Sequence, residues 1–418
     1  MDRPANKFGV LALLVVVYTL NFLDRQIVGI LATPIKAELH LSDTQLGLLG
    51  GPAFALFYTL LGIPVAWAAD RYNRTWIITA GLVLWSAFTA ACGMAQSFSL
   101  LFLARMGVGV GEAGCVAPSY SLIADYFPRA ERSRAFAGFS LGIPIGSALG
   151  IILGGLVASY FNWRIAFIGV GLAGLLVAPV FLRFTSEPQR GRFDGQSGPA
   201  KASIGKVFGT IVRKPSFWYM SFGASCCSIM NYGSFFWFPS FLLRSYHLPL
   251  REAAYLWGAI VFVGGIIGIW LGGVLADRFS RSTGALALIP AIALLIAAPG
   301  AALALFAPSL AVSCFLFVVP VATSLAYIGP TVAAVQGLVP ASMRATASSF
   351  YLFINNLLGL GLGTILIGAI SDSLRVRFGA EALRYSIFAG AGFYVIAAAF
   401  FFAAARTLAR DWNDNSRA

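Results

Sequence analysis

The chain has 418 residues, of which 59% are hydrophobic and only 11% are charged, and its formal net charge is +13. Ordinary soluble proteins carry roughly 25% charged residues, so this composition excludes a soluble globular protein. Runs of about 20 apolar residues, each long enough to cross a bilayer as a helix, recur along the whole chain. We therefore expect an all-α integral membrane protein.

Twelve segments are expected to span the membrane. The first, from Phe8 to about Ile35, is too long and too interrupted by charge for a cleaved signal peptide. The others are expected near Thr44 to Ala69, Thr75 to Gln96, Leu100 to Tyr126, Arg134 to Tyr160, Trp163 to Phe184, Phe217 to Leu243, Arg251 to Ala276, Thr283 to Phe306, Leu310 to Val339, Ser342 to Ser371 and Leu383 to Ala405.

The basic residues predict the orientation of these spans. If both termini lie on one side, that side receives 20 of the 29 Lys and Arg residues and the opposite side receives seven. Cytoplasmic loops are enriched in Lys and Arg, so both termini are expected to be cytoplasmic. Topology then accounts for the positive charge, and a nucleic-acid partner is not expected. The short loops favour the inner membrane of a bacterium.

Four charged residues lie inside apolar spans, namely Asp24 and Arg25 in the first and Arg105 and Glu112 in the fourth. A charge at the bilayer centre costs about 2.5 to 3.5 kcal/mol on insertion scales, so such residues usually face a cavity and have a function. Arg105 and Glu112 are seven residues apart and share a helix face. Asp24 could pair with Arg105 and Arg25 with Glu112, but the sequence leaves the pairing open.

The sequence predicts two halves joined by a polar linker. The predicted domains are an N-terminal six-helix bundle of residues 1–184, a cytoplasmic linker of residues 185–215 and a C-terminal six-helix bundle of residues 216–418. A-W-A-A-D-R-Y-N-R, which ends at Arg74, recurs as G-V-L-A-D-R-F-S-R, which ends at Arg281. P-R-A-E-R-S-R-A from Pro128 recurs as P-A-S-M-R-A-T-A from Pro340. Both repeats lie 207 to 212 residues apart, which indicates duplication of a six-helix unit.

The two D-R-x-x-R loops resemble the signature of the major facilitator superfamily. The resemblance covers essentially the whole chain and implies two six-helix bundles with alternating access. It also implies a cytoplasmic gate, although Asn73 and Ser280 replace the usual glycine and the alternative is a row of basic membrane anchors. The residues assigned to the gate are Asp70, Arg71, Arg74, Asp277, Arg278, Arg281, Arg132 and Arg344.

Two further motifs resemble a narrower group. They are N-F-L-D-R-Q-I-V at Asn21 to Val28 and R-M-G-V-G-V-G-E-A-G-C-V-A-P-S-Y-S-L-I-A-D-Y-F-P at Arg105 to Pro128. Both are similar to Spinster-type transporters, a family that moves lysophospholipids and sphingosine-1-phosphate. The resemblance implies a lipid-like, anionic substrate.

The intramembrane charges have two candidate roles. Desolvation favours a protonated carboxyl and a nearby cation favours the carboxylate, so a conformational change could switch Asp24 or Glu112 between the two forms. Arg25 and Arg105 could bind a phosphate or carboxylate headgroup through their guanidinium groups. A purely structural ion-pair network is the alternative.

The second half offers aromatic and mildly polar side chains in place of charge, and these could contact an apolar tail. The candidates are Asn231, Tyr232, Phe235, Trp237, Tyr327 and Asn355. Gly107, Gly109 and Gly111 between Arg105 and Glu112 are expected to allow close helix packing.

We therefore expect a proton-coupled, alternating-access transporter of an anionic amphiphile, working as a monomer without a cofactor. A transporter of a small organic anion is the first alternative. A membrane-embedded lipid enzyme is a weaker one, because the sequence contains no intramembrane His, no metal-ligand set and no soluble catalytic domain.

Overall fold

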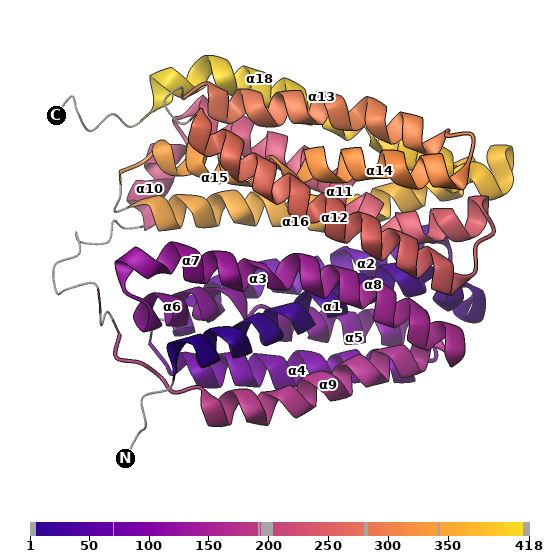
Figure 1. The fold of residues 1–418 in the computed structure, drawn as a ribbon, viewed down its shortest axis with the longest axis horizontal. Helices are drawn as coiled ribbons and strands as arrows, with labels where there is room; N and C mark the ends of the chain where they lie inside the picture. The colour runs from indigo at the N-terminus through magenta and orange to yellow at the C-terminus, as the bar shows by residue number, and fades with distance from the viewer. Residues whose placement is uncertain are drawn as a thin grey trace. The chain divides into compact units, whose positions relative to one another are not determined.

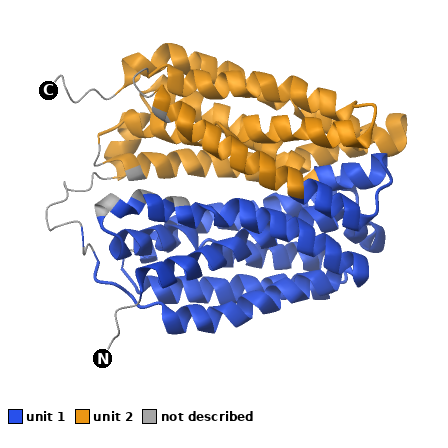
Figure 2. Cartoon of the chain, viewed as in Figure 1, with its two compact units in different colours: residues 1–198, 238–258 blue, residues 199–237, 259–418 orange. Residues whose placement is uncertain are grey.

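The computed structural model describes residues 6–69, 71–190, 193, 204–279, 283–340 and 343–412. Within these ranges the chain is helical almost throughout and has no β-strand, which confirms the expected all-α class. The chain forms two compact units (Figure 2). Unit 1 comprises residues 1–198 and 238–258, and unit 2 comprises residues 199–237 and 259–418.

Unit 1 is built from helices that run side by side (Figure 1). Helix α1 packs along α8, and α4 packs along both α5 and α9. The helices are α1 (Lys7–Leu39), α2 (Asp43–Gly50), α3 (Pro52–Ala69), α4 (Arg74–Met94), α5 (Phe98–Glu112), α6 (Val116–Tyr126), α7 (Arg129–Ser140), α8 (Gly142–Tyr160) and α9 (Trp163–Phe184).

Unit 2 repeats this arrangement with α13 packed on α14 and α18. Its helices are α10 (Ile204–Ile211), α13 (Ala285–Leu305), α14 (Leu310–Leu325), α15 (Ile328–Gly337), α16 (Arg344–Phe378), the 3-10 helix η2 (Gly379–Glu381), α17 (Ala382–Gly390) and α18 (Gly392–Asp411). Two long helices, α11 (Pro215–Ser245) and α12 (Leu250–Arg278), belong to unit 2 except for residues 238–258, which lie in unit 1.

Ten segments of the described chain are long and apolar enough to span a membrane. Nine of them coincide with expected spans, and the tenth, Thr346–Asp411, contains α16, α17 and α18 and so covers the last two expected spans. Helix α11 occupies the position of the seventh expected span. It is not among the ten because its Ser, Tyr, Trp and Asn side chains lower its mean hydropathy.

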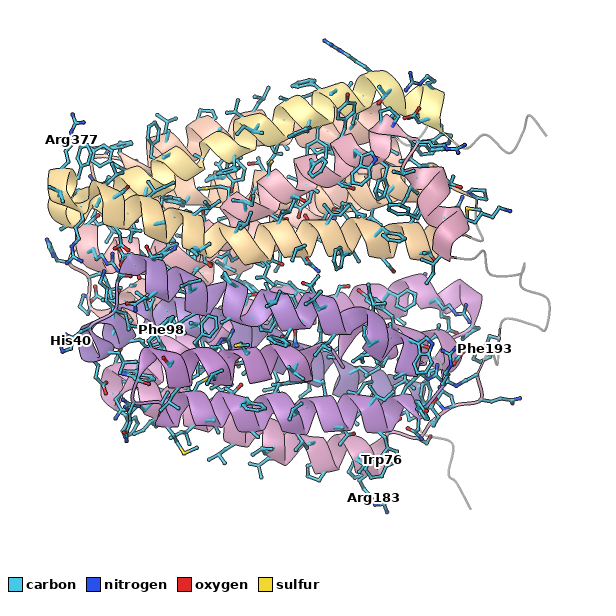
Figure 3. All side chains as sticks on the ribbon, turned by 180° about the vertical axis from the view of Figure 1, so that it is seen from behind. His40, Trp76, Phe98, Arg183, Phe193 and Arg377 are labelled. Atoms are coloured by element: carbon cyan, nitrogen blue, oxygen red, sulfur yellow. The ribbon has the colours of Figure 1, made fainter. Side chains whose placement is uncertain are left out.

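The ends of unit 1 follow from the direction of its helices. His40 after α1 and Phe98 at the start of α5 mark one end, whereas Trp76 in α4 and Arg183 in α9 mark the other (Figure 3). We call these the His40 end and the Arg74 end of unit 1, since α4 begins at Arg74.

The segment 238–258 is held in unit 1 at its His40 end. Asp43 is buried and accepts two hydrogen bonds from Arg244, at 2.7 and 2.9 Å, and one from Lys36. Ser240 also lies 3.1 Å from the Thr33 hydroxyl. Because these partners come from helices far apart in the sequence, the periodicity of the spans did not reveal them.

Glycines hold α1 against α8. A Cβ at Gly146 would lie 2.3 Å from the Thr19 carbonyl oxygen, and one at Gly150 would lie 2.5 Å from the Leu23 carbonyl oxygen. Only glycine permits this approach of two helix backbones. The contact fixes the position of the stretch of α1 that contains the two charged residues of the first span.

We expect Gly150→Leu to destabilise unit 1, because a side chain at this position would push α8 away from α1. Overpacking of this kind costs about 1 to 3 kcal/mol, and thermal unfolding of the purified protein in detergent would measure it. Gly169 in α9 is the control, since a Cβ there meets nothing within 4 Å. Gly169→Ala should keep the parent melting temperature or raise it slightly, and an unchanged melting temperature for Gly150→Leu would contradict the close packing.

Candidate functional site

The four intramembrane charges meet in the interior of unit 1. Asp24 and Arg25 come from α1, and Arg105 and Glu112 come from α5. Asp24, Arg105 and Glu112 are at most 1% exposed. The structure therefore brings together all four residues that the sequence singled out in the first and fourth spans.

The pairing that the sequence left open is resolved. Arg25 Nε donates a hydrogen bond to Glu112 Oε2 at 2.8 Å, whereas Arg105 Nη1 lies 3.6 Å from Asp24 Oδ2. The second distance is that of an ion pair but exceeds a normal hydrogen bond. The network is thus formally neutral, with one tight pair and one loose pair.

The position of Glu112 in its helix is a second reason why its carboxylate needs a nearby cation. It is the last residue of α5, and a carboxylate at a helix C-terminus is disfavoured by the helix dipole. The chain turns at Ala113 to Cys115 before α6 begins. The break in the helix therefore places a buried acid at a position that needs a cation.

Aromatic rings surround the arginines. The Arg25 Cζ atom lies 4.5 Å from the Tyr58 ring centroid, 4.9 Å from that of Phe54 and 5.0 Å from that of Phe22. Phe54 is also 5.5 Å from Arg105 Cζ. Ring faces attract guanidinium groups and exclude water. The sequence analysis missed Phe54 and Tyr58, although the aromatic run F-A-L-F-Y of α3 was the available signal.

The glycines of α5 make this arrangement possible. A Cβ at Gly109 would lie 2.5 Å from the Phe54 carbonyl oxygen, and one at Gly111 would lie 2.5 Å from the Trp85 backbone nitrogen. Gly107 faces the Phe88 ring in the same way. The expected close packing at these three glycines is confirmed, and it holds α3 and α4 against the charged helix.

Several buried polar atoms of the site have no hydrogen-bond partner among the described residues. They are both carboxyl oxygens of Asp24, both amide atoms of Asn21, the Thr89 hydroxyl, Glu112 Oε1, and Nε and Nη1 of Arg105. Most buried polar groups in proteins are hydrogen-bonded, so such a concentration needs an explanation.

Several candidates in unit 2 behave differently, because they form hydrogen bonds with neighbouring residues of the same unit. The Tyr394 hydroxyl donates to Asn231 Oδ1 at 2.8 Å, and Asn231 Nδ2 donates to the Ser324 carbonyl oxygen at 3.3 Å. Ser228 Oγ lies 2.8 Å from the Tyr327 hydroxyl and donates to Asn355 Oδ1 at 2.8 Å. Asn231 thus belongs to one buried hydrogen-bonded group, and Tyr327 and Asn355 belong to another.

The aromatic candidates of unit 2 differ in exposure. Trp237 is fully buried, and its indole nitrogen donates to the Thr364 carbonyl oxygen at 2.7 Å. Tyr232 and Phe235 are half-buried. Among the described residues of unit 2, Asp411 is the only buried charged one.

The gate candidates fall into two groups. Arg74 is 1% exposed and is held within unit 1, where its guanidinium donates to Asp125 at 2.5 Å, to Glu187 at 2.7 Å and to Ser121 at 2.7 Å. Glu187 also accepts from the backbone nitrogen of Arg74 at 2.8 Å and so caps the start of α4.

The remaining gate candidates are less enclosed. Arg132 donates to the carbonyl oxygens of Ala124 and Phe127, and Arg71 stacks on Trp67 at 3.9 Å. Arg71, Arg278 and Arg344 are exposed. Asp70, Arg281 and the side chain of Asp277 lie outside the described part of the structure.

The sequence analysis missed the partners of Arg74. Asp125 stands in the I-A-D-Y-F-P end of a quoted motif, and an acid at the Arg74 end of α6 was a usable signal. Glu187 lies 113 residues from Arg74, and only its position directly after a span pointed to it.

Comparison with known proteins identifies the family. Residues 14–364 match the Major Facilitator Superfamily. An MFS-type efflux pump of Mycolicibacterium smegmatis is 33% identical over 91% of this chain and 88% of its own length. The protein spinster homolog 1 of Mus musculus is 31% identical over 85% of this chain and 71% of its own length.

A solved structure agrees with these relatives. The crystal structure of a bacterial homologue of the human lysosomal transporter Spinster, in an inward-facing and unoccupied conformation, is 34% identical in sequence. It matches 99% of this chain and 100% of its own with a TM-score of 0.91. The chain therefore belongs to the Major Facilitator Superfamily, as a multi-pass membrane transporter of the Spinster type.

Proposed function

We propose that this transporter moves an anionic amphiphile, such as a lysophospholipid or a sphingosine-1-phosphate-like lipid, by proton-coupled alternating access. The proposed location is a bacterial inner membrane, with both termini in the cytoplasm and the chain acting as a monomer. In this orientation the Arg74 end of unit 1 is cytoplasmic, which agrees with the excess of basic residues on that side.

The observation that carries the proton role is the state of the Asp24 carboxyl. It is 1% exposed, its nearest cation Arg105 is 3.6 Å away, and neither oxygen has a hydrogen-bond partner among the described residues. A buried carboxylate held this loosely loses little when it takes up a proton. Glu112, which is bonded to Arg25 at 2.8 Å, is the second proton carrier in this proposal.

Arg105 and Arg25 are proposed to bind the headgroup. Arg105 has Nε and Nη1 without hydrogen-bond partners in the described chain, so its guanidinium has donors for an anionic oxygen. The rings of Phe54 and Tyr58 hold Arg25 and keep the surroundings apolar. A desolvated pair of arginines suits a phosphate better than a neutral sugar.

The apolar tail is proposed to contact side chains of unit 2. Tyr232 and Phe235 are half-buried, and the nearby candidates Asn231, Tyr327 and Asn355 are buried and hydrogen-bonded within unit 2. Trp237, which is buried and donates to the Thr364 carbonyl oxygen, is proposed to line the same site. The choice of a lipid rests on the resemblance of the two motifs to Spinster-type transporters, and a small organic anion stays the alternative substrate.

The gate role is proposed for the D-R-x-x-R loops. In unit 1 the buried Arg74 joins α4, α6 and the segment after α9 through Asp125 and Glu187, so this end moves as one piece. The exposed Arg71, Arg278 and Arg344 are then the side chains available for changing contacts at the cytoplasmic side.

We expect Asp24→Asn to abolish the stimulation of transport by a proton gradient, because an amide cannot take up the proton. Uptake of a labelled lysophospholipid into proteoliposomes, with and without an imposed pH gradient, measures this. Glu131→Gln is the control for loss of an acid outside the network, because its pair with Lys7 is substantially exposed. Gradient-stimulated transport that persists in Asp24→Asn would contradict the proton role.

A competition assay is expected to show whether the transported substrate is an amphiphile or a small organic anion. An excess of unlabelled lysophospholipid should inhibit uptake of the labelled lipid at least tenfold more strongly than the same concentration of a short-chain carboxylate. The reverse order would favour the small organic anion. Thin-layer analysis of the transported lipid should show it unchanged, and a cleaved product would instead support a membrane-embedded enzyme.

Loss of the Arg74 pair is expected to weaken unit 1. Asp125→Asn removes one partner of a buried ion pair, which costs about 3 kcal/mol when Glu187 keeps the other contact. Glu131→Gln is the matched control, because its pair with Lys7 is substantially exposed and should contribute less than about 1 kcal/mol. Equal melting temperatures for the two variants would show that the ion pair between Arg74 and Asp125 does not stabilise unit 1.

A further inference from the structure

Asn21 is a buried amide whose two polar atoms have no hydrogen-bond partner among the described residues. It is 0% exposed. Asn231 of unit 2 shows the usual behaviour of a buried amide, since it donates to the Ser324 carbonyl oxygen and accepts from Tyr394. The difference asks for an explanation, because buried polar atoms in native proteins are paired in nearly all cases.

The position of Asn21 points to the proton site. It lies three residues before Asp24 and four before Arg25, so it occupies the same face of α1, about 4.5 Å from Asp24 along the helix axis. The opposite side of this stretch, at Thr19 and Leu23, is closed by the glycines of α8. Asn21 is therefore the helix-face neighbour of the Asp24 carboxyl on the Arg74 side.

Few other groups can accept a hydrogen bond from a protonated Asp24. The charged and titratable groups around it are Arg25 on its own helix, Arg105 and Glu112 from α5, and Cys92 from α4. The arginines are donors only, and Glu112 Oε2 is bonded to Arg25. Glu112 Oε1 and the Thr89 hydroxyl have no hydrogen-bond partner among the described residues, so they are the other acceptors near Asp24. Tyr18 and Tyr58 lie next to Arg25, and the Thr89 hydroxyl is a neighbour of Asp24 from α4.

We propose that Asn21 is a positioning residue for the proton step, in which its Oδ1 accepts the hydrogen bond of protonated Asp24. The inference rests on the proposed proton role of Asp24. A proton from water binds an Asp24 oxygen, the carboxyl becomes neutral, and its O–H turns from Arg105 to the Asn21 amide oxygen. Arg105 then lacks its anionic partner and is available to an anionic headgroup, so proton binding and headgroup binding favour each other.

This assignment fixes the sign of a measurable shift. An acceptor that serves only the protonated carboxyl raises its proton affinity, so its removal moves the pH midpoint of substrate binding downwards. The loss of one hydrogen bond corresponds to about one pH unit, or a tenfold change in proton affinity. If the Asn21 amide instead donated to the carboxylate, its removal would move the midpoint upwards.

The test compares Asn21→Leu with the full-length parent in detergent. Binding of a fluorescent lysophosphatidylglycerol is titrated between pH 5 and 9, and we expect the midpoint of Asn21→Leu to fall by about one unit. Asn21→Gln, which keeps an amide oxygen, should recover part of the shift. Thr79→Val is the matched control, because this buried hydroxyl is already bonded to the Thr75 carbonyl oxygen and the substitution should leave the midpoint unchanged.

Two further measurements distinguish a failure of the proton role of Asp24 from a failure of the Asn21 role alone. The infrared carbonyl band of the protonated carboxyl, assigned by its loss in Asp24→Asn, should move to higher frequency in Asn21→Leu and needs no substrate. The melting temperature of Asn21→Leu should not fall, since leucine leaves no unpaired amide. If substrate binding by the parent protein does not change with pH and the parent lacks the infrared carbonyl band, both the proton role of Asp24 and the role of Asn21 are overturned. A parent with a clear midpoint and an Asn21→Leu variant with an equal or higher midpoint would overturn only the role of Asn21.

Discussion

The need to neutralise charge inside an apolar bundle governs the interior of unit 1. A buried ion is tolerated only when a partner of opposite sign and further hydrogen bonds compensate for the lost water. Arg25 and Glu112 meet this condition at 2.8 Å, whereas Asp24 and Arg105 meet it only in part at 3.6 Å. The first pair fastens α1 to α5, whereas the second is looser, and the proton role that we propose for Asp24 rests on this difference.

The two ion pairs depend on small residues, because these let the helix backbones approach one another closely. Gly150 admits the backbone of α1, Gly109 admits that of α3, and Gly111 admits that of α4, each within a distance that a Cβ would forbid. The rings of Phe54 and Tyr58 from α3 pack against Arg25 of α1, whose guanidinium bonds to Glu112 of α5. Backbone packing, rather than the charges themselves, decides how near the four ionised groups come.

The sequence predicted the helical class, most spans and the four charges well, because hydropathy and spacing along one helix are local properties. It left the pairing of Asp24 open, since the rotation of α1 against α5 is not a local property. It did not identify Glu187 as a partner of Arg74 or Arg244 as a partner of Asp43, because these contacts join segments 113 and 201 residues apart. Residues 238–258 belong to unit 1 although they follow the linker, and no hydropathy pattern carries that information.

The buried polar residues of the two units differ in a way that bears on mechanism. In unit 2, Asn231, Tyr327 and Asn355 each have a hydrogen-bond partner within the described chain, and paired buried polar groups rigidify their surroundings. In unit 1, Asn21 and Asp24 do not. Unpaired polar groups raise the energy of one state and so lower the cost of moving to another in which they are paired. We therefore propose that the chemical step of transport lies on α1, where buried polar groups lack partners among the described residues.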